Sequence, residues 1–453
     1  MRLAYFLFLI AVFFLCSRLR LEKILAPISG GIALIVFTYG IVQKFLIFPM
    51  ILENYRAGPS FYSQALVARA SSGRIFSIFP LPTLYAMVCG LLLIFIVHYL
   101  HHARGPARIF WGMLLLLGAM NLVLTESFGG ILFFTAGILF YLFASRTVRQ
   151  RILAPLLMVL ALVFFLVVAL RFSEARELAP AKLRFANWQQ AGRVISAAPV
   201  LGVGLGNYET TVPPHVKPDE PVSIYAHNFF LQMAAETGLP LLLFLVAIGL
   251  AWLKANLPAF LKPENAIFAS ASVLILLFNV FDIGNYFFAA GVSFAVVFSQ
   301  VAVLPGKPRP RHLVAVALPA MLLLVHAAAA SRQRTGDLWL SRQEPGQAEF
   351  FYRAALKWEP FSYRAWLGLA HIAWQCGDRE GADLALKKVL KIFPGQPYAN
   401  YLFSVSSWRQ GLHGTALVHA RKAASGNASN KEYRKWHEVV KSDLAKKPPL
   451  PGN

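Results

Sequence analysis

Residues 81–100 have the sequence LPTLYAMVCGLLLIFIVHYL, which contains no Asp, Glu, Lys or Arg. A helix of that length measures about 30 Å, enough to cross the hydrocarbon core of a bilayer. Similar apolar runs recur along the chain on both sides of this one. We expect apolar helices in or across a membrane at Leu3–Cys16, Ile24–Phe48, Leu81–Leu100, Ile109–Leu124, Ile131–Phe143, Ile152–Leu170, Leu231–Leu253, Ile267–Ile283, Phe287–Leu304 and Leu313–Ala330.

The composition of the 453-residue chain also indicates a membrane protein, with 57% hydrophobic and 14% charged residues. Soluble domains carry about 25% charged residues, so this chain lacks the polar surface that keeps a globule in solution. Its net charge of +22 resides mostly in short loops between apolar runs, which favours an anionic membrane as partner over nucleic acid. Cys16, Cys89 and Cys376 lie far apart and the sequence shows no metal-ligand spacing, so we expect no bound metal or other cofactor.

Short basic loops occur at every second connection between the expected helices, and loops of this kind face the cytoplasm. They lie within residues 18–23, 104–108, 146–151, 254–262 and 307–311. The connections between them, at residues 49–80 and 171–230, then lie on the outer side. The N-terminus and everything after Ala330 are expected on that outer side as well.

The chain changes character after Ala330, where charged residues become frequent and long apolar runs stop. Residues recur there at a spacing of 34, the period of tetratricopeptide repeats. The recurring pairs are Leu356 and Leu390, Pro360 and Pro394, Gly377 and Gly411, and Ala382 and Ala416. We expect helical repeats over residues 331–440, with ordinary helical hairpins as the alternative, and a disordered tail over 441–453. The fold class is then all-α, with about ten membrane helices in residues 1–330 ahead of this helical domain.

The densest pattern of polar residues and glycines lies in and just after the long outer loop. It consists of RFANW at 184–188, APVLGVGLGN at 198–207, YAHNFFLQ at 225–232 and AETGLP at 235–240. In this order the motifs resemble those of the O-antigen ligase/polymerase superfamily. The glycines at 202, 204 and 206 are expected to allow tight turns, because no βαβ unit surrounds them to form a dinucleotide site.

Three further segments are similar to the same family. They are RIFSIFP at 74–80, SFGG at 127–130 and FNVFD at 278–282. Phe128 stands where the family usually has an arginine, so the role of that arginine is not carried over to this chain. The resemblance covers about residues 42–303, which is most of the expected membrane region.

The resemblance implies a membrane glycosyltransferase that uses no cofactor. Its donor would be a glycan on a polyprenyl diphosphate, transferred at the outer face of a bacterial inner membrane to an acceptor hydroxyl. The acceptor can be a lipid A core, a growing polysaccharide or a protein, the last making the chain a protein O-oligosaccharyltransferase. Helical repeats in an extracytoplasmic C-terminal domain would favour a protein or polymer partner, since stacked repeats form concave binding surfaces.

His227 is the first candidate for catalysis, because a histidine titrates near neutral pH and can accept a proton from a hydroxyl. Its alternative role is that of an interfacial histidine bound to backbone. Arg184 and Arg74 match arginines of the family. Guanidinium groups bind phosphate oxygens in bidentate fashion, so both are expected to hold the diphosphate, with pairing to lipid phosphate as the alternative.

The remaining candidates are expected to bind substrate. They are Arg69, Arg193, Tyr225, Asn228, Glu236 and Asp282. The two acids among them lie at entries to the membrane, where a carboxylate is costly unless it is paired. We therefore expect Glu236 or Asp282 to pair with one of the arginines.

Two functions of other classes compete with a transferase. A transporter or flippase would show duplicated halves and helices broken inside the membrane, and the sequence shows no such duplication. A membrane-anchored repeat scaffold without chemistry would leave the motifs between Arg184 and Pro240 unexplained.

The orientation of the chain can be tested by labelling single cysteines with a reagent that does not cross the membrane. We expect labelling from outside at Gly58, Lys217 and Gly346, because these positions lie in or after the outer loops. Positions Arg149 and Lys262 should be protected until the membrane is opened. Labelling of position 149 from outside would overturn the orientation.

Overall fold

The computed structural model describes residues 2–19, 21–57, 64–145, 179–217, 220, 223–301, 310–427 and 430–446. These residues form helices and connecting turns without any β-strand, so the all-α prediction is confirmed for them. Six helices within this part are long and apolar enough to cross a membrane, and three more are apolar but shorter. The protein is therefore a multi-pass membrane protein. The expected helix Ile152–Leu170 lies outside the described residues.

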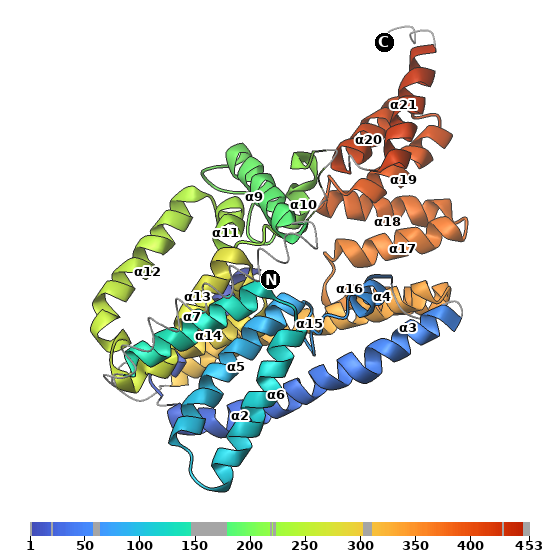
Figure 1. The fold of residues 1–453 in the computed structure, drawn as a ribbon. Helices are drawn as coiled ribbons and strands as arrows, with labels where there is room; N and C mark the ends of the chain where they lie inside the picture. The colour runs from blue at the N-terminus through green and yellow to red at the C-terminus, as the bar shows by residue number, and fades with distance from the viewer. Residues whose placement is uncertain are drawn as a thin grey trace.

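The apolar helices gather into one bundle (Figure 1). They are α1 (Arg2–Cys16), α2 (Glu22–Val42), α5 (Pro82–His102), α6 (Pro106–Leu124), α7 (Phe128–Ala144), α12 (Leu239–Phe260), α13 (Ala266–Phe281), α14 (Phe288–Val301) and α15 (Pro310–Ser341). After α2 the helix continues through a π-helical segment, Gln43–Ile47, into α3 (Phe48–Ala57), and α4 (Gln64–Ser72) follows.

Helix α5 forms the centre of the bundle, where α2, α6, α7 and α13 pack against it. Its side chains from Leu84 to Ile96 are all buried, which agrees with a helix that is apolar on every side. Small residues let the neighbouring helices approach closely. A Cβ at Gly137 of α7 would lie 2.8 Å from the terminal methyl group of Ile94, so glycine lets α7 pack close to α5 without moving that side chain. Helix α12, by contrast, exposes a continuous apolar surface that suits contact with lipid.

The outer loop folds over one end of the bundle. It contributes α9 (Ala179–Ala197), the single turn α10 (Tyr208–Thr211), the 3₁₀ turn η2 (Pro213–His215) and the short helix α11 (Phe229–Thr237). In Figure 1 these green segments lie between the membrane helices and the C-terminal helices. The loop is therefore in a position to join the two parts of the molecule.

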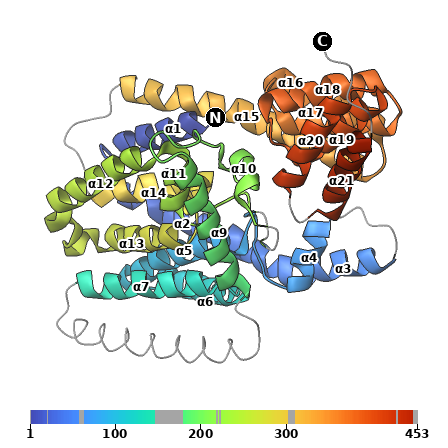
Figure 2. The same cartoon turned by 90° about the horizontal axis from the view of Figure 1, so that it is seen from above.

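Helix α15 connects the bundle to the C-terminal part without a break. We expected this span to end at Ala330, but the helix continues to Ser341. Its first half packs against α1 and its second half against α16, as Figure 2 shows. A helix of 32 residues is about 48 Å long, so it extends well beyond a bilayer core of about 30 Å.

The C-terminal helices stack as antiparallel pairs. They are α16 (Pro345–Trp358), α17 (Tyr363–Gln375), α18 (Arg379–Ile392), α19 (Pro397–Arg409), α20 (His413–Gly426) and α21 (Lys431–Lys446). The pair α17 and α18 is followed after 34 residues by the pair α19 and α20, which have the same lengths. A tetratricopeptide fold for this region remains a prediction. Helix α21 reaches Lys446, into the tail for which disorder was expected, and residues 447–453 lie outside the described part.

The single helix expected at Leu231–Leu253 is wrong, because the structure divides it at Gly238. Helix α11 ends at Thr237, Gly238 has φ +82°, and α12 begins at Leu239. The backbone of the outer loop passes close to this break. A Cβ at position 238 would lie 2.0 Å from the Val200 carbonyl oxygen, so the close approach requires glycine.

Replacing Gly238 with alanine should therefore destabilise the protein, by about 2 kcal/mol or more, because the new methyl group meets backbone in a conformation that L-residues avoid. The matched control is Gly249→Ala in α12, where a Cβ would meet nothing within 4 Å. That variant should be as stable as the wild type or slightly more stable. Thermal unfolding in detergent compares the two variants, and equal melting temperatures would contradict the assigned break.

Candidate functional site

Segments distant in the sequence meet around the carboxylate of Asp282, at the end of α13. The carboxylate is buried and accepts hydrogen bonds from the Ile283 N–H (2.9 Å) and from His227 Nδ1 (3.2 Å). Its second oxygen, Oδ2, lies 3.7 Å from Nη2 of Arg184 in α9. As expected from the sequence, an acid at this position is paired with an arginine.

Burial alone would raise the pKa of the Asp282 carboxyl, since an apolar environment disfavours charge. The hydrogen bond from His227, the positive charge that His227 has when protonated, the charge of Arg184 and the Ile283 N–H together hold that pKa below its ordinary value. Asp282 is therefore a carboxylate at neutral pH. A carboxylate only accepts hydrogen bonds, so His227 Nδ1 must carry the shared proton.

The imidazole of His227 is consequently oriented with Nε2 as the basic nitrogen. Its side chain is 28% exposed, so the described residues cover the imidazole only in part. The His227 backbone has φ +50°, which is unusual for a residue other than glycine. Two contacts stabilise this conformation: the Trp188 indole donates to the His227 carbonyl oxygen (3.2 Å), and the Ala226 N–H donates to the Gln232 side chain (2.8 Å).

Arg184 is only partly engaged by Asp282. The separation of 3.7 Å is an ion pair and too long for a hydrogen bond, and Oδ2 of Asp282 lacks a hydrogen-bond partner within the described residues. The Arg184 side chain is 34% exposed. Among the described residues its guanidinium has no other hydrogen bond or ion pair, so its donors can bind an anion.

Arg74 approaches the same region from the turn before α5. Its Nε donates to the carbonyl oxygen of Thr125 (3.0 Å), which fixes the guanidinium beside the loop between α6 and α7. Burial lowers the pKa of Arg74, the charge of Glu126 raises it, and the charge of Arg184 lowers it further. The electrostatic interaction between Arg74 and Arg184 means that two guanidinium groups share one region, an arrangement that attracts a polyvalent anion.

The glycine-rich turn is fastened to the end of α11. The Val203 N–H donates to the Ala235 carbonyl (2.9 Å), and the Gly204 N–H donates to the Glu236 carbonyl (2.8 Å). Gly202, Gly204 and Gly206 all have φ between +64° and +91°. A Cβ at Gly202 would lie 2.4 Å from the Glu236 carbonyl carbon. The expected tight turns are present, and they bring the loop backbone onto α11.

The side chain of Glu236 adds a further hydrogen bond between the glycine turn and α11. It is 1% exposed and accepts hydrogen bonds from the Gly206 N–H (2.7 Å), from Gln232 Nε2 (2.9 Å) and from the Tyr286 hydroxyl. Because Gln232 also holds the backbone next to His227, the carboxylate of Glu236 connects the glycine turn to the catalytic candidate. Both of its oxygens are thus already used within the protein.

Residues 112–246 match the family model for O-antigen ligase. The match begins in α6 and includes α9, the glycine turn, His227 and the break at Gly238. It supports the resemblance to the O-antigen ligase/polymerase superfamily, a family of membrane glycan ligases and polymerases. Arg74 and Asp282 lie outside the matched O-antigen ligase segment. No curated protein matches the chain.

The other substrate-binding candidates contact structural groups. Arg193 donates to the His215 carbonyl (2.6 Å) and pairs with Glu220. The Arg69 guanidinium lies over the ring of Phe76, 5.6 Å from its centre. These contacts hold the outer loop and the turn before α5, respectively.

Asn228 and Tyr225 flank the catalytic candidate. Asn228 caps α11 through the Leu231 N–H (2.9 Å) and donates to the Val280 carbonyl (2.7 Å), which ties the loop to the end of α13. The ring of Tyr225 packs edge-on against Tyr286. The structure thus joins His227 and Arg184 through Asp282 and surrounds them with residues that fix the backbone. Arg74 interacts electrostatically with Arg184 and donates its hydrogen bond to the Thr125 carbonyl.

Three residues of this site were not selected from the sequence. Trp188 and Gln232 occur within motifs of the O-antigen ligase segment, RFANW and YAHNFFLQ, so their motif membership was an available signal. Tyr286 lies in the turn η4 (Gly284–Tyr286), outside any motif, and nothing in the sequence marks its contact with Glu236.

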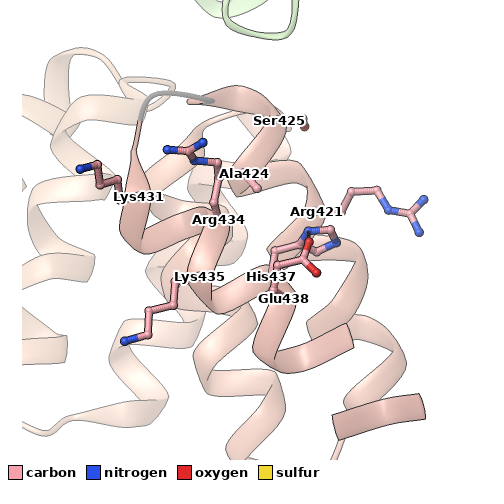
Figure 3. A pocket seen from close by; sticks show the side chains of 8 residues that line it. All are labelled: Arg421, Ala424, Ser425, Lys431, Arg434, Lys435, His437 and Glu438. Atoms are coloured by element: carbon pink, nitrogen blue, oxygen red, sulfur yellow. Dashed lines mark ion pairs between the residues drawn. The ribbon is translucent and has the colours of Figure 1, made fainter. Parts of the chain in front are cut away.

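A hollow of about 590 Å³ lies apart from this site, between α20 and α21. It is lined by Arg421, Ala424, Ser425, Lys431, Arg434, Lys435, His437 and Glu438. Figure 3 shows Arg421 extending to one side of the hollow and Lys431, Arg434 and Lys435 extending to the other. They therefore do not converge on one point, whereas His227 and Arg184 both approach the carboxylate of Asp282.

The low pKa of Asp282 predicts a pH-dependent contribution to stability. A carboxyl whose pKa is lower in the folded state stabilises that state above its unfolded pKa of about 4, and the stabilisation is lost as the pH falls through the folded pKa. Asp282→Asn should therefore be less stable than wild type at pH 7, by roughly 1–3 kcal/mol. The difference between the two melting temperatures should shrink below about pH 4. A difference independent of pH would show that the charge does not contribute.

Proposed function

We propose that this protein transfers a glycan from a polyprenyl-diphosphate carrier to an acceptor hydroxyl at the outer face of a bacterial inner membrane. The observation that supports this most directly is the carboxylate of Asp282, whose Oδ1 binds Nδ1 of His227 (3.2 Å) and whose Oδ2 lies 3.7 Å from Nη2 of Arg184. One carboxylate therefore holds the candidate base and a candidate phosphate-binding cation. The match to O-antigen ligase over residues 112–246 agrees with it.

In the proposed reaction the acceptor hydroxyl donates its proton to His227 Nε2 as its oxygen attacks the anomeric carbon of the glycan. A new bond forms between that carbon and the acceptor oxygen. The bond from the anomeric carbon to the diphosphate oxygen breaks, and its electrons leave with the polyprenyl diphosphate. The positive charge that forms on His227 is stabilised by the adjacent Asp282 carboxylate.

Arg184 and Arg74 would bind the diphosphate and stabilise the negative charge that grows on it as the bond breaks. Two guanidinium groups supply the positive charge that a metal ion supplies in other phosphate sites. We therefore propose a reaction that is independent of metal. Because Arg184 keeps most of its donors available, it can turn toward the diphosphate while staying near Asp282.

We propose that the site lies on the outer side of the membrane because of the directions of the two helices next to it. Helix α12 starts at Leu239 next to the glycine turn and ends before Lys262, and α13 returns to Asp282. The basic loop at 254–262 and the site are thus at opposite ends of these helices. If basic loops mark the cytoplasm, the site faces outward.

The test is transfer from a purified polyprenyl-diphosphate glycan to acceptor in liposomes, with EDTA present. His227→Ala should slow transfer by about 10² to 10⁴-fold while donor affinity changes little, because a general base acts on the acceptor. Arg184→Lys keeps the charge and loses the bidentate geometry, so donor affinity should fall together with rate.

Matched controls separate these effects from general damage. Lys182→Ala removes an exposed cation from the same helix as Arg184, and His101→Ala removes an exposed histidine at the end of α5. Both should transfer at the wild-type rate. Full activity of a well-folded His227→Ala would contradict the role of the base, and loss of wild-type activity in EDTA would contradict the metal-free reaction.

A further inference from the structure

The C-terminal helices contact the outer loop at α10. Oε1 of Glu209 accepts a hydrogen bond from the Tyr363 hydroxyl (2.9 Å) and forms an ion pair with Arg364. Arg364 also donates from Nε to the Tyr363 hydroxyl (3.1 Å). One carboxylate of the outer loop therefore binds two consecutive residues at the start of α17.

This contact is anchored on the C-terminal side. The ring of Tyr363 packs edge-on against the buried Phe393, with ring centres 5.3 Å apart. A second point of contact lies nearby, since a Cβ at Gly395 would be 3.8 Å from the Thr210 carbonyl oxygen. Helix α20 also reaches η2, and Figure 1 shows α10 next to the C-terminal helices. The C-terminal helices thus hold the short segment α10–η2 at several points.

The opposite side of α10 faces the candidate site. Tyr208, which precedes Glu209, is fully buried in a cluster that includes Ala226 and Ala235. Ala226 is the neighbour of His227 in the chain, and Ala235 is the neighbour of Glu236. Adjacent residues of a single helical turn therefore bind the C-terminal helices on one side and the backbone around His227 on the other.

We propose that Glu209, Tyr363 and Arg364 are positioning residues, through which the C-terminal helices hold α10 and Tyr208 in the arrangement that transfer requires. This inference rests on the proposed function for its activity measurement. In this proposal the C-terminal helices help to position the catalytic groups, whether or not they also bind a partner. A displacement of about 1 Å at a catalytic group can lower a rate by about 100-fold, so a lost contact of this kind should be measurable.

Charge reversal tests the contact. Glu209→Arg and Arg364→Glu each place like charges together, and each should lower kcat by about tenfold or more. The double variant Glu209→Arg/Arg364→Glu restores opposite charges and should recover most of the rate. Donor affinity should stay near the wild-type value throughout, because neither residue contacts Arg184 or Arg74 in the described structure.

The matched control is the pair Glu349 and Arg353 on the surface of α16, 2.7 Å apart. Reversing either charge there, or both, should leave kcat unchanged, since exposed pairs within one helix contribute little. If reversing a charge in this control pair lowers kcat as much as Glu209→Arg does, the loss comes from charge reversal in general. That result would overturn the proposal.

A cross-linking measurement keeps this test separate from the proposed function. Thr210→Cys and Gly395→Cys, combined with Cys376→Ser to remove the exposed native thiol, should react with a short bis-thiol linker. Cross-linking should fall in Glu209→Arg and return in the double variant, whatever reaction the protein performs. If the wild type shows no transfer, the proposed function fails while cross-linking still reports the contact. If cross-linking falls but kcat does not, Glu209, Tyr363 and Arg364 have no positioning role.

Discussion

The buried carboxylate of Asp282 determines the arrangement of the groups around it. It ends α13, accepts the Ile283 N–H, and receives His227 and Arg184 from two other segments. A buried charge without partners is costly, so these segments are held where they can compensate it. The same contact selects the imidazole tautomer and leaves Arg184 incompletely bound. In the proposed reaction, this one carboxylate orients the base and leaves Arg184 able to bind the diphosphate.

A second carboxylate, that of Glu236, satisfies backbone groups of the outer loop. The outer loop has many irregular backbone groups, and those that are buried need hydrogen-bond partners within the protein. Glu236 binds an N–H of the glycine turn, and the turn itself binds the carbonyl groups at the end of α11. The break at Gly238 makes room for this close approach. The irregular backbone of the loop is therefore held by hydrogen bonds to other parts of the protein. These contacts fix the segment that carries His227.

The same loop also joins the bundle to the C-terminal helices. Helix α15 makes one connection by running continuously from α1 to α16, and the contact of Glu209 with Tyr363 and Arg364 makes another. Two attachments on different segments restrict rotation of the C-terminal helices more than a single linker does. In the positioning role that we propose, these two attachments are how the C-terminal helices act on the geometry near His227.

The sequence alone determined the apolar helices, the change of character after Ala330, the tight glycine turns and the motifs that contain His227 and Arg184, because these features depend on neighbouring residues. Only the tertiary structure decided that the helix breaks at Gly238, after α11 ends at Thr237, since the constraint comes from the Val200 carbonyl. It also decided that Asp282 orients His227, 55 residues away, and that Glu209 binds Tyr363, 154 residues away. Contacts of this kind depend on how helices pack, and no local pattern of residue types specifies which distant side chains will meet.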